Sequence, residues 1–411
     1  MHMTDPTSEM TVYDAIVVGG GPAGATAAQA LAAEGHKTLL IDKPGRIKPC
    51  GGAIPPRLVQ DFDIPEHMIV ARANTARMVS PKGRFVDMPI NGGTVAMVDR
   101  EHFDEWLRVR AAEHGADRMD GEFVGIERDE AGRAIVLCRP HGADRKSDPV
   151  RLATKSVIGA DGARSRIARD EVGGEQPKSV FAYHEIIRSP EQANPEQFEG
   201  SRCEIRYEGR LSPDFYAWIF PHGDTTSVGV GSAQKGFSLR QAVTDLRGDA
   251  DLTTAETLRT EGAPIPLKPM KKWDNGKDVL LAGDAAGCVA PASGEGIYYA
   301  MLGGQTAAEA VHEFLETANP KALAKARKRY MSEHGKVFFI LGIMQHFWYR
   351  NDKRRERFVN ICDDPDVQRL TWEAYMNKRL VRANPMAHMR IFFKDMAHLL
   401  GFVRVKDQRP Q

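Results

Sequence analysis

The sequence predicts an α/β protein that combines a nucleotide-binding domain, an inserted antiparallel β-sheet domain and a helical C-terminal region. Three features of the chain predict this fold class. A strand-like apolar run at 13–18 leads directly into the glycine-rich segment 19–24. Residues 179–263 hold short β-branched and aromatic runs separated by turn residues, which is typical of antiparallel strands. The chain after about residue 296 is expected to be mainly helical.

The first domain begins with a βαβ unit. Gly19-x-Gly21-x-x-Gly24 stands between the first strand and an Ala-rich helix over 25–33, and the second strand ends at Asp42. The first glycine permits a tight turn, the second lets the backbone approach a pyrophosphate, and the third lets the helix pack on the strand. The helix N-terminus favours phosphate charge, and the acid can bond a ribose. The unit predicts a dinucleotide site but does not distinguish FAD from NAD.

The remaining elements follow from turn residues and periodicity. We expect a loop over 44–56, hairpins over 77–97, a helix over 101–113 capped by Asp99, strands over 121–152, and short buried strands at 157–159 and 279–281. The predicted domains are a discontinuous nucleotide-binding domain (12–76, 96–175 and 270–320), an antiparallel-sheet substrate domain (77–95 and 176–269) and a helical C-terminal region (321–411).

Composition narrows the function classes. The 411 residues are 42% hydrophobic and 27% charged with a net charge of +1, which predicts a globular protein without strong attraction for nucleic acid. Residues 321–411 carry 20 Lys and Arg against 9 Asp and Glu, which suits either an anionic partner or a solvated helical face. No signal peptide or spanning apolar run is visible, so we expect a cytoplasmic protein with peripheral membrane contact at most. The cysteines form no CxxC pair, and no metal site is expected: Cys50, Cys138, Cys203, Cys288 and Cys362.

Two later segments point to FAD. GADGARS at 159–165 and LLAGDAAG at 280–287 resemble the DG and GD motifs of FAD-dependent hydroxylases and their relatives. The resemblance implies a glutathione-reductase-like FAD-binding Rossmann domain of the hydroxylase type, with tight, non-covalent FAD and with Asp284 on the ribityl chain. It also places the glycine amides of PASGEGI, 291–297, beside the flavin ring, where they stabilise negative charge on reduced flavin. The implied cofactor contacts are Gly19, Gly21, Ala23, Gly24, Asp42, Lys43, Cys50, Gly51, Arg100, Asp161, Gly283, Asp284, Gly294, Gly296 and Ile297.

An aromatic string gives the first indication of a substrate. Tyr216, Trp218 and Phe220 alternate and are followed by Pro221, and Gly229-x-Gly231 comes eight residues later. Alternation on a strand puts the three rings on one face, as a wall for a long hydrocarbon or as an ordinary aromatic core stripe. The string resembles the signature of the geranylgeranyl reductase family, and this resemblance implies that Tyr216, Trp218, Phe220, Pro221, Gly229 and Gly231 contact substrate.

Further resemblance to that family covers nearly the whole chain, from Tyr13 to about Gly401. Lys48-Pro49-Cys50-Gly51-Gly52 resembles its Cys-Gly-Gly loop, whose cysteine lies near the flavin. The segments 354–359, 362–378 and 384–401 resemble its photosynthetic branch, which reduces the geranylgeranyl chain of chlorophyll or bacteriochlorophyll, or of the free diphosphate, to phytyl. A bacteriochlorophyll enzyme is the better match. The resemblance implies NADPH as reductant, with Arg164 as a phosphate contact.

The predicted chemistry joins a proton and a hydride to an isolated alkene, three times over. Cys50 is the first candidate for the proton relay, and an ordered water or a proton held on the flavin competes with it. Peripheral contact with the photosynthetic membrane and a pigment-synthase partner are also expected. Met389, Phe393, Met396 and Leu400, with Arg390 and Lys394 between them, form either a basic membrane-surface helix or a core stripe. Phe338, Phe339, Phe347 and Trp348 either line the end of a prenyl tunnel or simply pack.

Three other functions compete with this one. An FAD aromatic hydroxylase shares the cofactor motifs but not the Cys-Gly-Gly loop or the aromatic string. A reductase of archaeal-type lipids or quinone side chains differs only in its substrate. A prenyl-binding escort protein carries isoprenoids without FAD, and the complete set of Gly19, Gly21, Gly24, Asp42 and Asp284 speaks against it.

Overall fold

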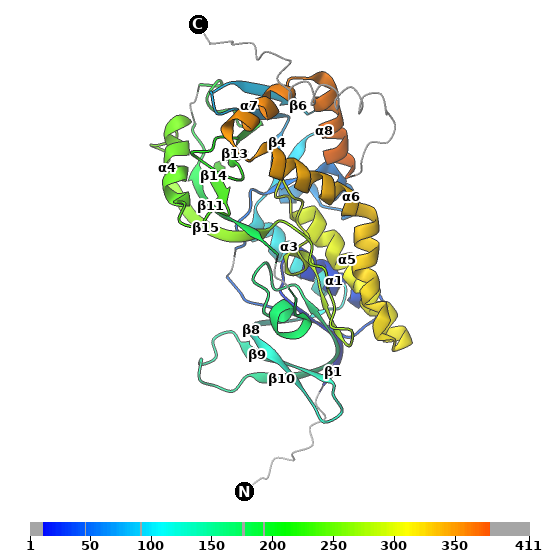
Figure 1. Cartoon of the computed structure of the whole chain (residues 1–411). Helices are drawn as coiled ribbons and strands as arrows, with labels where there is room; N and C mark the ends of the chain where they lie inside the picture. Colours follow the sequence, from blue (N-terminus) through cyan, green and yellow to red (C-terminus); the bar gives the residue numbers. More distant parts are fainter. Residues whose placement is uncertain (1–10, 46, 91–92, 175–176, 192–193, 379–411) are drawn as a thin grey trace.

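The computed structural model describes residues 11–45, 47–90, 93–174, 177–191 and 194–378. The nucleotide-binding sheet occupies the lower end of the molecule in Figure 1 and a second sheet the upper end. Helices α5 (Ile297–Thr317) and α6 (Ala324–Trp348) pack against each other between the two ends of the molecule. The cofactor motifs and the aromatic string lie on loops and strands between these parts, as the contacts below show.

The first sheet has the parallel strand order β8-β2-β1-β10-β16. Val18 aligns with Ile41 and with Gly159, which aligns with Leu281, so four strands end at one edge. Ligands of open α/β sheets bind at the carboxyl ends of the strands. The strands are β1 (Val12–Val18), β2 (Thr38–Asp42), β8 (Asp117–Arg128), β10 (Val150–Gly159) and β16 (Val279–Leu281). Strands β8 and β10 extend past the sheet and pair antiparallel with β9 (Ala134–Pro140).

The central strands of this sheet carry apolar side chains that are buried on both faces. The central strands β1 and β2 are Val-, Ile- and Leu-rich and almost wholly inaccessible, as expected for parallel strands covered by helices. Helix α1 (Pro22–Ala33) begins with Pro at its first turn, where the missing N–H costs no hydrogen bond. Helix α3 (Arg100–Glu113) begins one residue before the predicted 101–113, and the Asp99 side chain accepts a hydrogen bond from the Glu101 amide. The predicted cap is therefore confirmed.

The second sheet has seven strands in the order β15-β11-β14-β13-β12-β5-β6. All neighbours are antiparallel except β12 and β5, which run parallel. Helix α4 (Leu239–Asp249) packs on β11 and β14. The strands are β5 (Thr75–Val79), β6 (Phe85–Pro89), β11 (Ser179–Arg188), β12 (Arg202–Arg206), β13 (Ala217–His222), β14 (Thr225–Ser232) and β15 (Thr257–Pro266).

A third, three-stranded sheet corrects the expected hairpins over 77–97. Strands β5 and β6 do form a hairpin, but β7 (Val95–Val98) leaves that sheet and lies between β3 (Ala53–Ile54) and β4 (Ile69–Ala73). All four residues of β7 are buried, which suits the centre of a sheet better than an edge. Strand β3 and helix α2 (Pro56–Asp61) also occupy the end of the segment predicted as a loop over 44–56.

The C-terminal region is helical as far as the structure describes it. After α6, it contains α7 (Asp352–Ile361) and α8 (Pro365–Asn377). Phe338 and Trp348 are buried, Phe339 is 69% exposed, and Phe347 lies under the Arg354 guanidinium. The predicted amphipathic segment with Met389, Phe393, Met396 and Leu400 lies outside the described residues. None of the helices within 11–378 combines the length and hydropathy needed to cross a bilayer.

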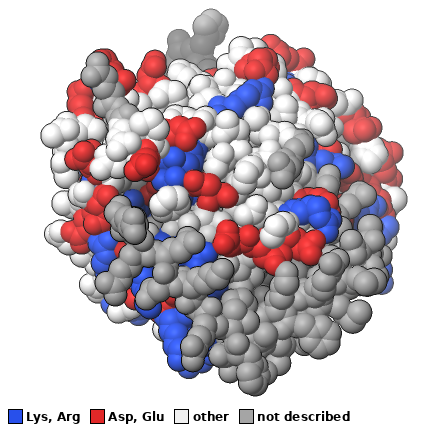
Figure 2. Space-filling view, turned by 90° about the horizontal axis from the view of Figure 1, so that it is seen from above, with Lys and Arg blue, Asp and Glu red and all other residues white. Residues whose placement is uncertain are grey.

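Charged side chains of both signs are intermingled on the end of the molecule seen from above (Figure 2). No large patch of one sign stands out among the described residues of that face. Part of the excess of Lys and Arg within 321–378 is balanced by neighbouring acids, for example where Arg329 pairs with Glu309 and Glu313. Peripheral membrane contact stays a prediction.

Candidate active site

The glycine-rich turn between β1 and α1 is tight at two glycines and open at the third. Gly19 has φ +104°, and a Cβ there would lie 2.3 Å from the Ala160 carbonyl oxygen. A Cβ at Gly24 would lie 1.8 Å from the Gly19 oxygen, so α1 packs directly on the turn. At Gly21 a Cβ would meet no atom within 4 Å. Backbone amides at an open helix N-terminus suit a pyrophosphate, so the turn fits the predicted dinucleotide.

The acid at the end of β2 has a partner that the sequence did not suggest. Arg108 Nη1 lies 3.1 Å from Asp42 Oδ2 and 3.1 Å from the Gly20 oxygen. Burial raises the pKa of Asp42, while the Gly20 amide and Arg108 act in the opposite direction. Arg108 repeats Arg100 and Asp104 at intervals of four on α3, a spacing that puts all three on one helix face. Lys43 lies on the surface, 3.5 Å from Glu122.

In the DG motif, the Asp161 side chain stabilises the turn that follows it. Asp161 accepts hydrogen bonds from the Ser165 hydroxyl at 2.5 Å, the Arg166 amide at 2.7 Å and the Ile167 amide at 3.2 Å. Burial raises the pKa of Asp161, and these donors oppose that effect. Arg164 is exposed, with its guanidinium 5.7 Å from the centre of the Phe181 ring. Its contact with NADPH stays a prediction.

The GD motif lies against the glycine-rich turn. A Cβ at Gly283 would lie 2.6 Å from the Ala23 Cβ, so the two motifs touch. Asp284 is buried, and Lys48 Nζ lies 2.5 Å from its Oδ2. A Cβ at Gly296, the residue that precedes α5, would lie 3.9 Å from Asp284 Oδ1. Lys48 was quoted in the Cys-Gly-Gly segment but not singled out as a site residue.

The Cys-Gly-Gly loop contacts the aromatic string. A Cβ at Gly51 would lie 2.9 Å from the Phe220 ring, and His222 Nε2 donates to the Gly51 oxygen at 3.0 Å. The Gly52 amide donates to Cys50 Sγ at 3.4 Å. Burial lowers the pKa of His222, so the ring is a neutral donor. The residues come together because Phe220 and His222, both on β13, contact the Cys-Gly-Gly loop.

Arg100 lies between the loop and α3. Its Nε and Nη2 donate to the two oxygens of Asp104 at 2.8 and 2.6 Å, and both side chains are buried. Burial alone lowers the pKa of Arg100, but Asp104 and the neighbouring Cys50 outweigh it and raise the pKa. The guanidinium thus holds a fixed positive charge beside the cysteine thiol. Its predicted contact with FAD is not tested by these contacts.

The rings of Tyr216, Trp218 and Phe220 form a row, as predicted from their alternation. Their centres are 6.1 and 6.4 Å apart along the string. A Cβ at Gly229 would lie 2.2 Å from Trp218 Cζ2, so this glycine gives the indole its place against β14. Gly231 likewise leaves room for the Phe215 ring, because a Cβ at Gly231 would lie 2.7 Å from Phe215 Cδ1.

This aromatic row, defined as Tyr216, Trp218 and Phe220, joins the Cys-Gly-Gly loop to the 291–297 segment. Phe220 touches the Gly51 position at one end, and at the other the Tyr216 hydroxyl donates to the Ser293 oxygen in the 291–297 segment. Pro221 continues β13 and pairs with Thr226. A contact of the row with substrate stays a prediction, but its place between the two loops is what such a role requires.

Two further residues of the site escaped prediction. Glu295 stands between Gly294 and Gly296, and its Oε2 accepts from Lys378 Nζ at the end of α8. Both side chains are buried. Lys378 is the last residue of a segment noted only for its resemblance, and no local pattern links it to Glu295.

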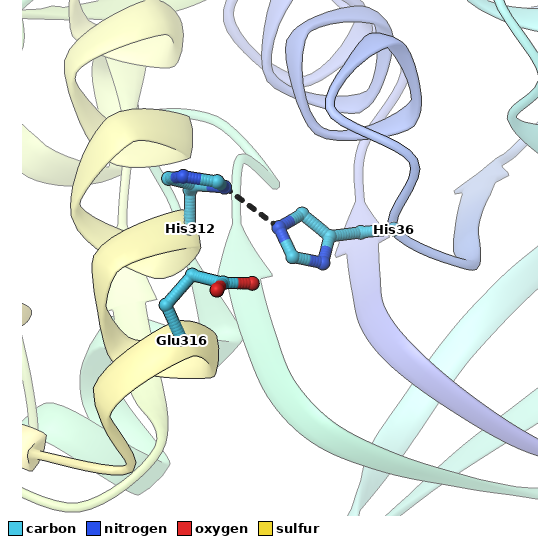
Figure 3. A group of neighbouring side chains, drawn as sticks. All are labelled: His36, His312 and Glu316. Atoms are coloured by element: carbon cyan, nitrogen blue, oxygen red, sulfur yellow. Dashed lines mark hydrogen bonds between the residues drawn. The ribbon is translucent and has the colours of Figure 1, made fainter.

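A separate cluster lies toward the far end of α5. Figure 3 shows His36, His312 and Glu316 pointing toward one another, and their ligand atoms lie within 4.8 Å. The residue types suit a divalent transition metal, but His36 Nε2 and His312 Nδ1 already share a hydrogen bond of 2.8 Å. The expectation of no metal site stays a prediction at this cluster. Since His312 follows Gly296 by 16 residues of helix, the cluster is not part of the cofactor site.

A hollow of about 410 Å³ lies on the second sheet next to α4, away from the aromatic row. Phe181, Tyr183 and Arg240 line it, and no residue of the aromatic row does. Because it shares no wall with the cofactor loops, we do not assign the substrate to it.

The turn, the paired acids and the contacting loops together define a flavin-dependent oxidoreductase. The sequence profile of the pyridine nucleotide-disulphide oxidoreductase family matches residues 13–200. A geranylgeranyl diphosphate reductase of Rhodobacter capsulatus is 54% identical over 95% of this chain and 98% of its own length. The chloroplastic geranylgeranyl diphosphate reductase of rice is 34% identical over 93% of this chain and 85% of its own. The chain belongs to the geranylgeranyl diphosphate reductase family.

More distant relatives share the architecture. A digeranylgeranylglycerophospholipid reductase of Methanocaldococcus jannaschii is 30% identical over 94% of this chain and 98% of its own. A solved geranylgeranyl bacteriochlorophyll reductase-like protein of Thermoplasma acidophilum superposes with a TM-score of 0.78 at 22% identity, covering 93% of this chain and 99% of its own. The latter likeness confirms the predicted fold, and the enzyme class is that of a flavin-dependent reductase.

Proposed function

We propose that this enzyme uses NADPH to saturate three C=C bonds of a geranylgeranyl chain, carried on bacteriochlorophyll or as the free diphosphate, to give phytyl. The observation that carries the proposal is the aromatic row, which spans from the Cys-Gly-Gly loop to the 291–297 segment. Three rigid rings offer an apolar wall to a polyprenyl chain between these two loops. The 54% identical relative is named for this substrate.

The chemistry needs a proton and a hydride at one isolated alkene. FAD held by the glycine-rich turn, Asp42 and Asp284 would supply the hydride when reduced. The chain supplies the proton from Cys50 Sγ, which passes to the less substituted alkene carbon and leaves positive charge on the tertiary carbon. Arg100 and the Gly52 amide lie beside the sulfur that gives up the proton, and water returns the proton. The aromatic faces of Trp218 and Phe220 favour the transient positive charge.

The test is an anaerobic reaction of the purified yellow protein with NADPH. Geranylgeranyl-bacteriochlorophyll and geranylgeranyl diphosphate are supplied in parallel, with flavin absorbance and product mass followed. Mass gains in steps of two hydrogens, up to three steps, establish the reaction and show which carrier is used. Flavin bleaching without a mass gain on either carrier rejects the substrate, and flavin that NADPH does not bleach rejects the reductant.

Cys50→Ala separates the proton donors. If Cys50 delivers the proton, the variant keeps flavin bleaching by NADPH but loses alkene reduction by about 100-fold or more, within the range of general acid catalysis. Cys138→Ala is the control, since Cys138 is buried on β9, which pairs with β8 and β10 away from the row. Full turnover by Cys50→Ala removes the thiol from the chemistry and leaves an ordered water or a proton held on the flavin as the donor.

An archaeal-type lipid is the second candidate substrate, favoured by the 30% identical relative from Methanocaldococcus jannaschii. The same assay with digeranylgeranyl glycerophospholipid distinguishes it, because the product gains mass in two chains. Oxygen consumption with hydroxylated product would instead indicate a hydroxylase, and a colourless protein that binds isoprenoid would indicate an escort protein.

A further inference from the structure

A buried carboxylate lies within the loop that leads into α5. The side chain of Glu295 is 8% exposed, and its Oε2 accepts from the Lys378 ammonium. Its second oxygen, Oε1, is inaccessible and has no hydrogen-bond partner among the described residues. A buried ion pair whose carboxylate is only half satisfied costs stability, so a fold under no other demand gains by replacing both partners with apolar groups.

The cation depends on this carboxylate. The side chain of Lys378 is 3% exposed, and it lies in the left-handed region with φ +54° immediately after α8. Its Nζ lies 3.9 Å from the centre of the Tyr375 ring and 5.6 and 5.7 Å from those of Tyr298 and Tyr299. Burial lowers the pKa of Lys378, and Glu295 opposes that effect. Three aromatic rings and one carboxylate therefore surround the ammonium.

Glu295 places one member of the pair inside the 291–297 loop, which leads into α5. Gly294, directly before Glu295, has φ +65°, and Gly296, directly after it, precedes the first turn of α5. The aromatic row reaches the same segment, because the Tyr216 hydroxyl donates to the Ser293 oxygen. Lys378 thus ties the last described helix to the loop whose amides face the flavin in this class of enzyme.

We propose that Glu295 and Lys378 are a positioning pair that fixes the 291–297 loop and keeps its charge balanced beside the flavin. The inference rests on the proposed function only for the presence of FAD at this loop. An unpaired carboxylate here would disfavour negative charge on reduced flavin, and an unpaired ammonium would favour it. The C-terminal helical region is then an integral part of the flavin site rather than an addition to it.

The test measures the flavin midpoint potential without any isoprenoid, by reductive titration against reference dyes. Lys378→Met is expected to lower the potential, Glu295→Gln to raise it, and the double variant to return toward the parent value. The control is Glu185→Gln, which breaks the 2.6 Å pair with Arg247 between β11 and α4. That control is expected to lower stability and leave the potential unchanged.

Opposite shifts that cancel in the double variant support the proposal, and a lower kcat with unchanged KM for NADPH accompanies them. Potentials equal to the parent in Lys378→Met and Glu295→Gln, with only a lower unfolding midpoint, overturn it and leave a purely structural pair. If Lys378→Met does not fold, Glu295→Gln against the double variant decides by the same criterion. If the variants shift the flavin potential as expected but the parent protein does not reduce a geranylgeranyl chain, only the proposed function is rejected. If the parent reduces the chain but the variants do not shift the potential, only this inference is rejected.

Discussion

Replacing Gly229 by Ala tests whether the aromatic row is held in place by the backbone of β14. The new Cβ would lie 2.2 Å from Trp218 Cζ2, 2.5 Å from Cε2 and 2.6 Å from the His184 Cβ. Ordinary contact begins near 3.4 Å, so the indole must move by roughly 1.2 Å away from the strand. Overpacking of this kind costs about 1–3 kcal/mol.

The movement has a second cost. The Trp218 Nε1 donates to the Ser227 hydroxyl at 3.0 Å, and a displaced indole loses that bond inside the sheet. A buried hydrogen bond of this type contributes about 1 kcal/mol. We therefore expect the variant to lose about 2–4 kcal/mol of unfolding free energy, together with most prenyl reduction.

Equilibrium urea unfolding, followed by far-UV circular dichroism, measures the loss. Gly125→Ala in β8 is the matched control, because a Cβ there meets no atom within 4 Å. Adding Trp218→Phe to the Gly229 variant removes Cζ2 and should recover part of the stability. A Gly229→Ala protein as stable as Gly125→Ala would refute the assignment of this glycine to the indole.

Three other perturbations have expected outcomes. Arg100→Leu leaves Asp104 buried without its partner and is expected to cost about 3–5 kcal/mol in urea unfolding. Asp42→Asn removes the carboxylate expected on the ribose and should weaken FAD binding by about tenfold, measured by flavin fluorescence on titration of the apoprotein. Burial is the main cause that lowers the pKa of His36 below its ordinary 6.5, and the neighbouring His312 lowers it further. The unfolded chain then binds the proton more readily, so His36 contributes stability above pH 6.5 that is lost as the pH falls through its folded pKa, and His312→Ala should flatten that dependence.

Controls distinguish each effect from general damage. Arg57→Leu breaks a half-exposed pair with Asp61 at the same i,i+4 spacing and should cost only about 0.3–0.5 kcal/mol. Asp245→Asn, on α4 beside the second sheet, should leave FAD affinity unchanged. His141→Ala, at an exposed turn, should leave the pH dependence of stability unchanged. An Arg100 variant as stable as the Arg57 variant, or an unaltered FAD affinity in Asp42→Asn, would contradict the corresponding assignment.

Local signals in the sequence predicted the parts of the fold that local signals determine. The Gly19 turn, the Asp99 cap and the alternation of Tyr216, Trp218 and Phe220 each depend on residues within a few positions, and all three lie as expected. Strand β7 was misassigned because burial on both faces depends on neighbours distant in the chain. Periodicity alone carries no information on such neighbours.

The charged partners of the site were missed for the same reason. Lys48 meets Asp284 across 236 positions, and Glu295 meets Lys378 across 83. Nothing in either local sequence favours one distant partner over another. Arg108 is the exception, since its four-residue repeat with Arg100 and Asp104 could have placed it on the same face of α3 as these two residues.

The parallel pairing of β12 with β5 has a consequence for biosynthesis. Thr75 aligns with Arg202, so the β5–β6 hairpin leaves the ribosome roughly 130 residues before its neighbour in the sheet. At about 5–20 residues per second this hairpin waits roughly 6–25 s with an unpaired edge. An exposed strand edge invites pairing with other chains. The nascent chain therefore passes through an interval of aggregation risk in which chaperone binding to residues 75–89 would protect it.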